Sequence, residues 1–398
     1  MSATSEDPVY WDPYDAQIAA NPYPVFRRLR EQAPLYYNER HDFYALSRFD
    51  DVAQALLDHA TYISGRGVIL EAIKANLPAP PGVFIFEDPP VHTVHRGLLS
   101  RVFTARKMNA LEPRIREFCA RCLDPLVGAG KFDFVADLGA QVPMKVIGML
   151  LGIPEQDQQA VRERGDARLR SEAGKPMAYT ERQFVDMSFD EYIEWRVKHP
   201  SDDLMTELLN AEFVDETGTT RRLTRTEVLV FVSVLATAGN ETTNRLIGWT
   251  GKVLADHPEQ RRQIAQNRAL IPQAIEEILR YEPPADHIGR CLARDVELYG
   301  TTVPKGSAML LLTGAANRDE RRFPDGERFD IHRDQYPHLT FGYGIHACLG
   351  SALARVEGRV VLDEVLKRFP EWEVDLDNAR LRSTTTVRGW ETLPVFVR

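Results

Sequence analysis

The sequence predicts a mainly α-helical protein with small β-sheets, built as a single domain over residues 1–398. Apolar residues recur at helical spacing along most of the chain, whereas strand-like runs are short. No repeat, low-complexity tract or Gly/Ser linker separates modules. With 43% hydrophobic and 27% charged residues, the chain has the composition of a globular protein with a sizeable core.

The expected strands fall into two hairpins. Leu35 to Tyr37 and Phe43 to Leu46 flank a polar turn, and Val296 to Leu298 and Thr301 to Val303 flank Tyr299-Gly300. We therefore expect small sheets beside a helical body.

Two segments interrupt the helical pattern. Residues 69–88 hold three prolines and a glycine, which predicts an irregular loop of the kind that often carries function. Residues 162–182 hold two glycines and a proline, and they form either a mobile lid between two helices or an ordinary solvated connection.

A long helix is expected after residue 223. Thr224 and Glu227 form a capping box, and Asp256-His257-Pro258 ends the run, which gives a helix of about 30 residues, or about 45 Å. Its apolar stretch, Val228 to Ala238, is shorter than the roughly 20 residues that cross a bilayer. We expect a buried helix that crosses the whole molecule.

Charge and cysteine content exclude several classes of function. The formal charge of −9 argues against nucleic-acid binding, and the polar, acidic stretch Met1 to Asp7 is unlike a secretory signal. Four cysteines are too few for a disulfide framework and suit a reducing compartment. We expect a cytoplasmic protein without a membrane partner.

The segment Phe341 to Gly350 is the most informative stretch. Gly342 and Gly344 let the backbone turn tightly before Cys348, and an apolar helical pattern begins directly afterwards. Cys348 should therefore lie at a helix N-terminus, where free amides and the helix dipole favour a thiolate that binds a metal. A buried structural cysteine is the alternative interpretation.

Three further patterns carry polar residues at helical spacing. In the long helix, Ala238-Gly239-Asn240-Glu241-Thr242 interrupts the apolar run, and such a spot can open locally and admit water. Glu277 and Arg280 share one face of a later helix. His92 and Arg96, at i and i+4 after a double proline, present two donors that suit a carboxylate.

The segment Phe341 to Gly350 resembles the haem-binding signature F-x-x-G-x-x-x-C-x-G of the cytochromes P450. The other patterns match the family in chain order, over nearly the whole sequence. The resemblance implies the P450 fold, with haem b between the long central helix and the helix after the cysteine loop. It makes Cys348 the iron ligand, with Phe341 packed against the sulfur. The implied cofactor contacts are His92, Arg96, Arg290, Phe341, His346, Cys348 and Gly350.

The resemblance also assigns roles to the polar pairs. Glu241 and Thr242 match the acid and the alcohol of the oxygen-activation motif. Glu277 and Arg280 match the E-x-x-R pair that holds the cysteine loop. Arg328 matches the third, structural partner, although Gly326 stands where proline is usual.

The implied function is hydroxylation of a hydrophobic small molecule that is steroid-, terpenoid- or fatty-acid-like. Electrons would come from a ferredoxin and its NAD(P)H-dependent reductase, because no reductase segment is fused to the chain. We expect the protein to be a monomer. A basic docking patch is expected from Arg101, Arg106, Lys107, Arg355 and Arg359. The expected pocket residues are Val234, Leu235, Ala238 and Ile288, with Asp286, His287, Thr384, Thr385 and Val387 nearby.

Three rival interpretations stay open. Cys119-x-x-Cys122 suits a metal or redox site by spacing, although a buried helical stripe explains it as well. A haem sensor has no need of the proton delivery that Glu241 and Thr242 imply. A peroxide-driven haem enzyme is disfavoured for the same reason.

Overall fold

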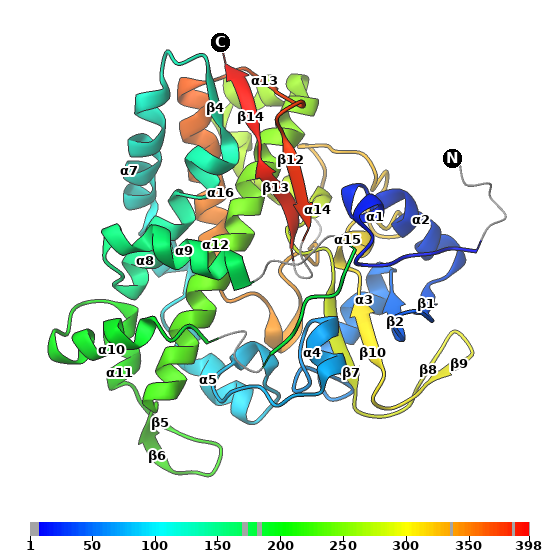
Figure 1. The fold of residues 1–398 in the computed structure, drawn as a ribbon. Coiled ribbons are helices and arrows are strands. Elements are labelled where there is room, and N and C mark those ends of the chain that lie inside the picture. The colour runs from blue at the N-terminus through cyan, green and yellow to red at the C-terminus, as the bar shows by residue number, and fades with distance from the viewer. Residues whose placement is uncertain (1–7, 169–173, 181–184, 335–336, 384–386, 398) are drawn as a thin grey trace.

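The computed structural model describes residues 8–168, 174–180, 185–334, 337–383 and 387–397 (Figure 1). Helix α12 (Arg225–Asp256) runs through the middle of the molecule. Both halves of the predicted capping box are present, because Thr224 Oγ1 accepts the amide of Glu227 while the Glu227 carboxylate accepts the amide of Thr224. The predicted buried helix is therefore confirmed, with 32 residues.

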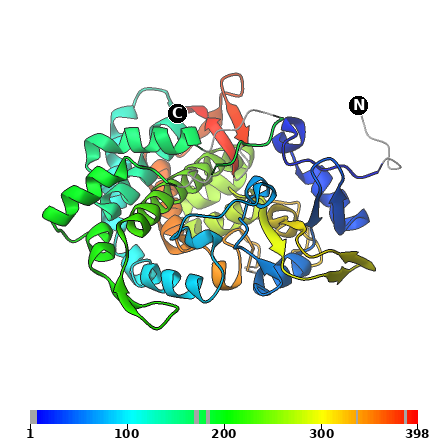
Figure 2. The ribbon, with the colours of Figure 1, turned by 60° about the horizontal axis from the view of Figure 1, so that its bottom comes forward.

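Many of the other helices pack around α12, whereas the N-terminal helices, blue in Figure 2, lie away from it. Direct contacts to it come from α8 (Val142–Leu151), α9 (Gln158–Arg168), α10 (Phe189–Lys198), α11 (Leu204–Asn210), α13 (Pro258–Gln266), α14 (Ile271–Tyr281), α16 (Ser351–Arg368) and the π-helical turn η3 (Phe134–Gly139). The remaining α-helices are α1 (Ala16–Ala20), α2 (Tyr23–Gln32), α3 (Phe49–Leu57), α4 (Leu70–Ala75), α5 (Val91–Ser100), α6 (Ala105–Asn109), α7 (Glu112–Leu123) and α15 (Thr313–Ala316). Single 3₁₀ turns are η1 (Phe84–Phe86), η2 (Asp124–Leu126), η4 (Glu155–Asp157), η5 (Arg268–Leu270) and η6 (Gly344–His346).

The largest sheet has the strand order β1-β2-β10-β7-β3. Only the β2–β10 pairing is parallel, and the chain connects these strands through most of the helical body. Its strands are β1 (Leu35–Asn38), β2 (Phe43–Leu46), β3 (Tyr62–Ile63), β7 (Ile288–Leu292) and β10 (Ala308–Leu311).

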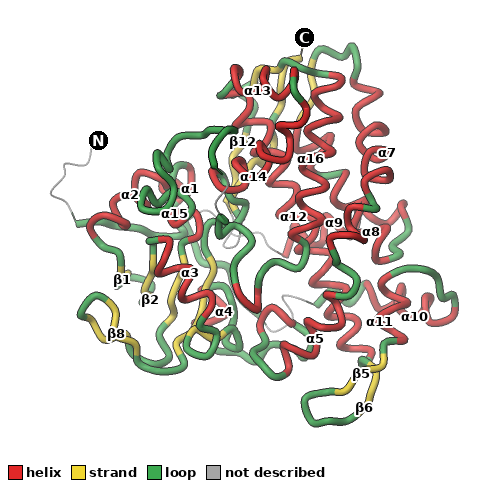
Figure 3. The backbone as a smooth tube through the Cα atoms, turned by 180° about the vertical axis from the view of Figure 1, so that it is seen from behind, coloured by secondary structure: helices red, strands yellow, loops and turns green. Residues whose placement is uncertain are grey.

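Smaller sheets complete the fold. They are formed by β11 (Trp372–Val374), β14 (Pro394–Val397) and β4 (Lys131–Asp133), and by the pairs β12 (Arg380–Ser383) with β13 (Arg388–Thr392), β5 (Glu212–Val214) with β6 (Thr220–Arg222), and β8 (Val296–Leu298) with β9 (Thr301–Val303). Both predicted hairpins, β1–β2 and β8–β9, are confirmed. Seen from behind in Figure 3, β1, β2 and β8 lie on one side of the molecule, and α7, α8 and α16 lie on the other.

Two predicted connections contain more helix than expected. Within residues 69–88, α4 and η1 form on either side of the prolines, because Leu70, Ala72 and Ile73 are buried against the body of the protein. Residues 162–168 belong to α9, whereas residues 169–173 and 181–184 of the expected lid lie outside the described part of the chain.

One apolar stretch escaped the sequence analysis. Phe134–Leu151 spans η3 and α8 and is apolar enough over 18 residues to cross a membrane by composition alone. Within the protein, 67% of it is buried, as in a core helix.

Candidate active site

The loop before α16, which carries Cys348, forms one wall of a cavity through Gly342 and His346. Gly342 and Gly344 have φ of 66° and 73°, and a Cβ at Gly344 would lie 2.9 Å from the carbonyl oxygen of Leu56. Glycine is therefore required at Gly344 by both backbone conformation and space. The amide of Cys348 donates to the carbonyl of Phe341 at 2.7 Å, which closes the loop.

The surroundings of the Cys348 sulfur pull its pKa in two directions. Burial raises the pKa of the thiol, and this effect outweighs the amides of Gly350 and Ser351 and the guanidinium of Arg96, which favour the thiolate. The expected position is confirmed, because α16 begins at Ser351.

A second wall comes from α12. The Thr242 hydroxyl donates to the carbonyl of Ala238 at 2.9 Å, and the helix is unbroken through this region rather than opened. The Glu241 carboxylate is buried and accepts from Arg245 at 2.8 Å. Arg245 also donates to the carbonyl of Trp390, so the acid is tied to β13 as well as to its own helix.

The cavity between these walls has a volume of about 310 Å³, in the range of roughly 300–1,000 Å³ that small-molecule pockets occupy. Its apolar lining includes three of the predicted pocket residues, Val234, Ala238 and Ile288. Leu235 is not among the residues that line this cavity; it is turned about 100° from Val234 around the helix and is buried in the core. Val387 lines the cavity, and Thr384 and Thr385 lie outside the described residues.

A cluster of basic side chains lies at the cavity beside the cysteine loop. Arg96, Arg290 and His346 line the cavity, and the ring of His92 packs against that of His346 at a centroid distance of 4.1 Å. Arg96 donates to the carbonyl of Ala347, which ties α5 to the cysteine loop.

These four basic residues form no ion pair with an acid among the described residues. Among the described residues, the guanidinium of Arg290 hydrogen-bonds only the carbonyl of Gly289, and Nε2 of both His92 and His346 is buried without a partner. Burial lowers the pKa of Arg290 to about 10, and burial together with His92, Arg290 and Arg96 lowers that of His346 to about 3. The positive charge of Arg96 and Arg290 needs an anionic partner, since an unpaired charge is costly to bury, and the unpartnered histidine nitrogens can add hydrogen bonds to it.

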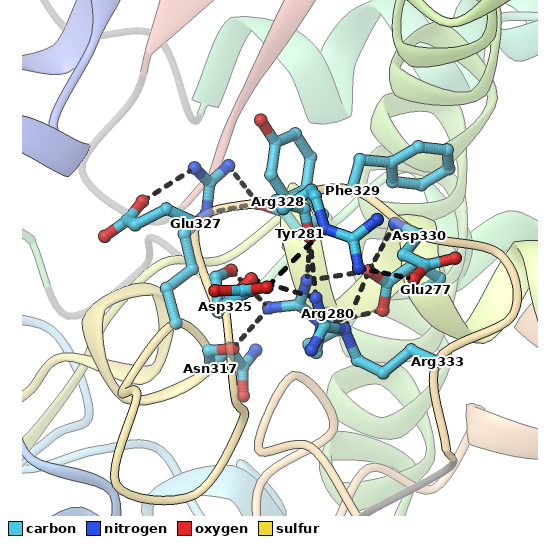
Figure 4. Close-up of polar contacts among 12 residues, drawn as sticks. Glu277, Arg280, Tyr281, Asn317, Asp325, Glu327, Arg328, Phe329, Asp330 and Arg333 are labelled. Carbon is cyan, nitrogen blue, oxygen red and sulfur yellow. Dashed lines mark hydrogen bonds and ion pairs between the residues drawn. The ribbon is translucent and has the colours of Figure 1, made fainter.

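The Glu277 carboxylate is the centre of a buried network (Figure 4), which lines a second pocket together with Phe341 and Gly342 of the cysteine loop. Arg280 donates to the carboxylate through two nitrogens at 2.7 Å each, as the sequence pattern predicted. The third partner is Arg333, which donates at 3.2 Å, and Asp330 adds its amide at 3.0 Å. The assignment of Arg328 is wrong.

Arg328 takes part only through its backbone. Its carbonyl accepts from Arg280 and Arg333, while its side chain is 63% exposed and pairs with Asp330. The turn at residues 325–330 leaves the Arg328 side chain exposed, whereas the Arg333 side chain reaches Glu277 (Figure 4).

The Cys119-x-x-Cys122 pattern does not form a metal site within the described residues, which contain no cluster of three or more candidate ligands. Cys119 is fully buried in α7, and burial raises the pKa of both thiols. The helical-stripe interpretation accounts for them.

Comparison with known proteins agrees with this site. The family model for cytochrome P450 matches residues 175–390. Cytochrome P450 130 of Mycobacterium tuberculosis is 35% identical over 382 residues, covering 90% of this chain and 91% of its own. Vitamin D(3) 25-hydroxylase of Pseudonocardia autotrophica is 34% identical over 409 residues, covering 99% and 98%. The structure of cytochrome P450 CYP109Q5 from Chondromyces apiculatus superposes with a TM-score of 0.85 at 35% identity, covering 97% and 98%.

The fold and the site thus define a haem-thiolate enzyme. The chain belongs to the cytochrome P450 family and is a monooxygenase that uses haem b. The residues present fit that cofactor, because the two carboxylates of haem b supply the anionic partners that the basic cluster lacks. Gly350, one of the expected cofactor contacts, borders open space, because a Cβ there would meet no protein atom within 4 Å.

Proposed function

We propose that this enzyme hydroxylates a hydrophobic small molecule of the steroid, terpenoid or fatty-acid-like kind, using electrons from a ferredoxin and its NAD(P)H-dependent reductase. The observation that carries the proposal is the apolar cavity between the cysteine loop and the polar interruption of α12. The relationship to a vitamin D(3) hydroxylase supports a bulky apolar substrate.

In this proposal Cys348 ligates the haem iron, and the haem supplies the activation of dioxygen. Arg96, Arg290 and His346 hold the haem carboxylates, and His92 supports the ring of His346. The network around Glu277 keeps the cysteine loop in place.

The protein's own part in catalysis is proton delivery along α12. Thr242 presents a hydroxyl at the cavity and can orient a water molecule there. Glu241 is bound by Arg245 at 2.8 Å, so it relays protons only when its carboxylate exchanges that partner for water. Arg245 thereby sets how readily the acid leaves its resting position.

The electron donor would dock on the face that α5, α6 and α16 share, since α6 and α16 are in contact. Arg101, Arg106 and Lys107 are exposed there and, like Arg359, make no ion pair among the described residues; Arg359 donates a hydrogen bond to Asn109. Arg355 contributes less than expected, because Glu276 neutralises it at 2.7 Å. Opposite charge on an acidic ferredoxin would steer the encounter.

We further propose that the chain is a single-domain, cytoplasmic monomer that binds neither nucleic acid nor membrane. Its charge of −9 and the burial of its longest apolar segment support this.

Rapid-mixing reduction of the haem enzyme by an acidic ferredoxin tests the proposal. Reversing Arg101 and Arg106 to Glu should slow reduction, most strongly at low ionic strength. Arg27→Glu with Arg40→Glu, two exposed arginines of the N-terminal region, is the matched control and should leave the rate unchanged. Equal reduction rates for both double variants would show that this face is not the docking site of the electron donor. The absence of hydroxylated product from any apolar compound would contradict the substrate class.

A further inference from the structure

His287, directly before β7, and Thr242, in α12, both line the cavity. His287 lies between α14 and β7 in a segment whose backbone is fixed by α15. The hydroxyl of Thr313 donates to the carbonyl of Ala285 at 3.1 Å, and the amide of Gly314 donates to the carbonyl of Asp286 at 2.8 Å.

The imidazole of His287 is held in one orientation. Its Nδ1 bonds to Oδ1 of Asp286 at 2.6 Å, and the ring of Trp11 meets it edge-on at a centroid distance of 5.7 Å. Within the described residues, Nε2 makes no hydrogen bond, and the side chain is 12% exposed. Because His287 lines the cavity, Nε2 is the polar atom that the ring offers to a bound molecule.

The charges around the ring determine what Nε2 can bind. Burial lowers the pKa of His287, but Asp286 and the buried Glu71 outweigh it and raise the pKa above its ordinary value. The contact with Asp286 favours the protonated ring, in which Nδ1 donates to the Asp286 carboxylate and Nε2 carries the second proton as a donor. Arg388 also acts on Asp286, but its own charge is met by Glu282 at 2.6 Å.

We propose that Nε2 of His287 donates a hydrogen bond to a neutral acceptor oxygen, a ketone or ester carbonyl, on the otherwise apolar substrate. This inference rests on the proposed function and narrows its substrate class. The positive charge of the ring is already balanced by Asp286 and faces Glu71, so a substrate carboxylate gains little there. A neutral carbonyl satisfies the donor without adding charge to a cavity walled by Val68, Phe84 and Ile288.

A buried donor that no substrate atom satisfies costs binding energy, so the site should reject analogues that lack the oxygen. His287 would then be a specificity-determining residue that fixes one end of the substrate. The other end is left to the apolar lining beside Ala238.

Matched pairs of probes test this in the haem-loaded enzyme. The steroid set compares androst-4-ene-3,17-dione with its 3-deoxy and 17-deoxy analogues. The terpenoid set compares a sesquiterpene ketone with the corresponding hydrocarbon. The fatty-acid set compares the methyl ester of a long-chain acid with the alkane of equal length and with the free acid. The Kd of each is measured from the haem absorption change on binding. In at least one skeleton, the carbonyl compound should bind about tenfold more tightly.

His287→Leu should remove that preference by weakening the carbonyl compound to the Kd of its deoxy analogue. His287→Gln, which keeps a neutral donor, should retain part of it. His199→Leu, at an exposed histidine of the α10 C-terminus, is the control and should change nothing. Haem content and thermal unfolding of each variant separate lost recognition from lost folding.

The proposal is overturned if, in every skeleton, the wild type binds the carbonyl compound no more tightly than the analogue without the oxygen. This includes the case in which neither compound binds. The proposal is also overturned if His287→Leu keeps the preference, or if the free acid binds more tightly than its methyl ester. Ferredoxin-driven hydroxylation of the deoxy compounds as fast as the carbonyl compounds would refute the inference while leaving the proposed function intact.

Discussion

Replacing Glu277 by alanine should destabilise the protein severely. The carboxylate is only 5% exposed, and its loss leaves Arg280, 3% exposed, and Arg333, 10% exposed, without their shared acid. The amide of Asp330 loses its acceptor as well. Breaking a buried ion pair in this way costs about 3–5 kcal/mol. That is a large share of the roughly 5–15 kcal/mol by which folded proteins are stable.

Denaturant unfolding of the haem-loaded protein measures the effect. Glu259→Ala is the matched control, because Glu259 and Arg262 form an ion pair at the same i, i+3 spacing but are 75% and 49% exposed. The control should lose at most about 1 kcal/mol. If Glu277→Ala cost no more than Glu259→Ala, the network would not hold the cysteine loop as inferred.

Three other changes test separate parts of the structure. Arg333→Ala should lower the unfolding midpoint well below that of Arg328→Ala, and the reverse order would restore the pattern-based assignment. Thr242→Ala should lower the ratio of product to NADH consumed and release more hydrogen peroxide. Thr243→Ala, at a residue outside the cavity lining, should change neither. An unchanged ratio in Thr242→Ala would contradict the proton path. His338 and Arg355 outweigh burial and lower the pKa of Glu276 to about 2 from 4.5, so its stabilisation is present above about pH 4.5 and lost as the pH falls toward 2. Glu276→Gln should therefore be less stable than the wild type at pH 7 and approach it in acid, and a pH-independent difference would refute this charge account.

Local chemistry explains which features the sequence predicted. The correctly predicted features involve residues within a few positions of one another. They are the capping box, the glycines before Cys348 and the Glu277–Arg280 spacing. Their geometry follows from turns and helical periodicity alone. The Glu241–Arg245 pair has the same kind of i, i+4 signal and could have been found by the same reasoning.

Features that depend on tertiary packing could not be predicted in this way. The choice of Arg333 over Arg328 is decided by the direction of one turn, and the Arg355–Glu276 pair joins residues 79 positions apart. The pairing of His287 with Asp286 is local, but the approach of Glu71 from α4 depends on the folded arrangement.

The reduced carbon-monoxide spectrum tests the central claim, that Cys348 ligates the haem iron, most directly. The wild type should give a thiolate-type Soret band, and Cys348→His should replace it by an imidazole-type band, because imidazole donates far less charge to iron. Cys122→Ser, at a cysteine remote from the loop in sequence, should leave the spectrum as in the wild type. A thiolate-type band that persists in Cys348→His would show that another residue is the ligand and would contradict the account.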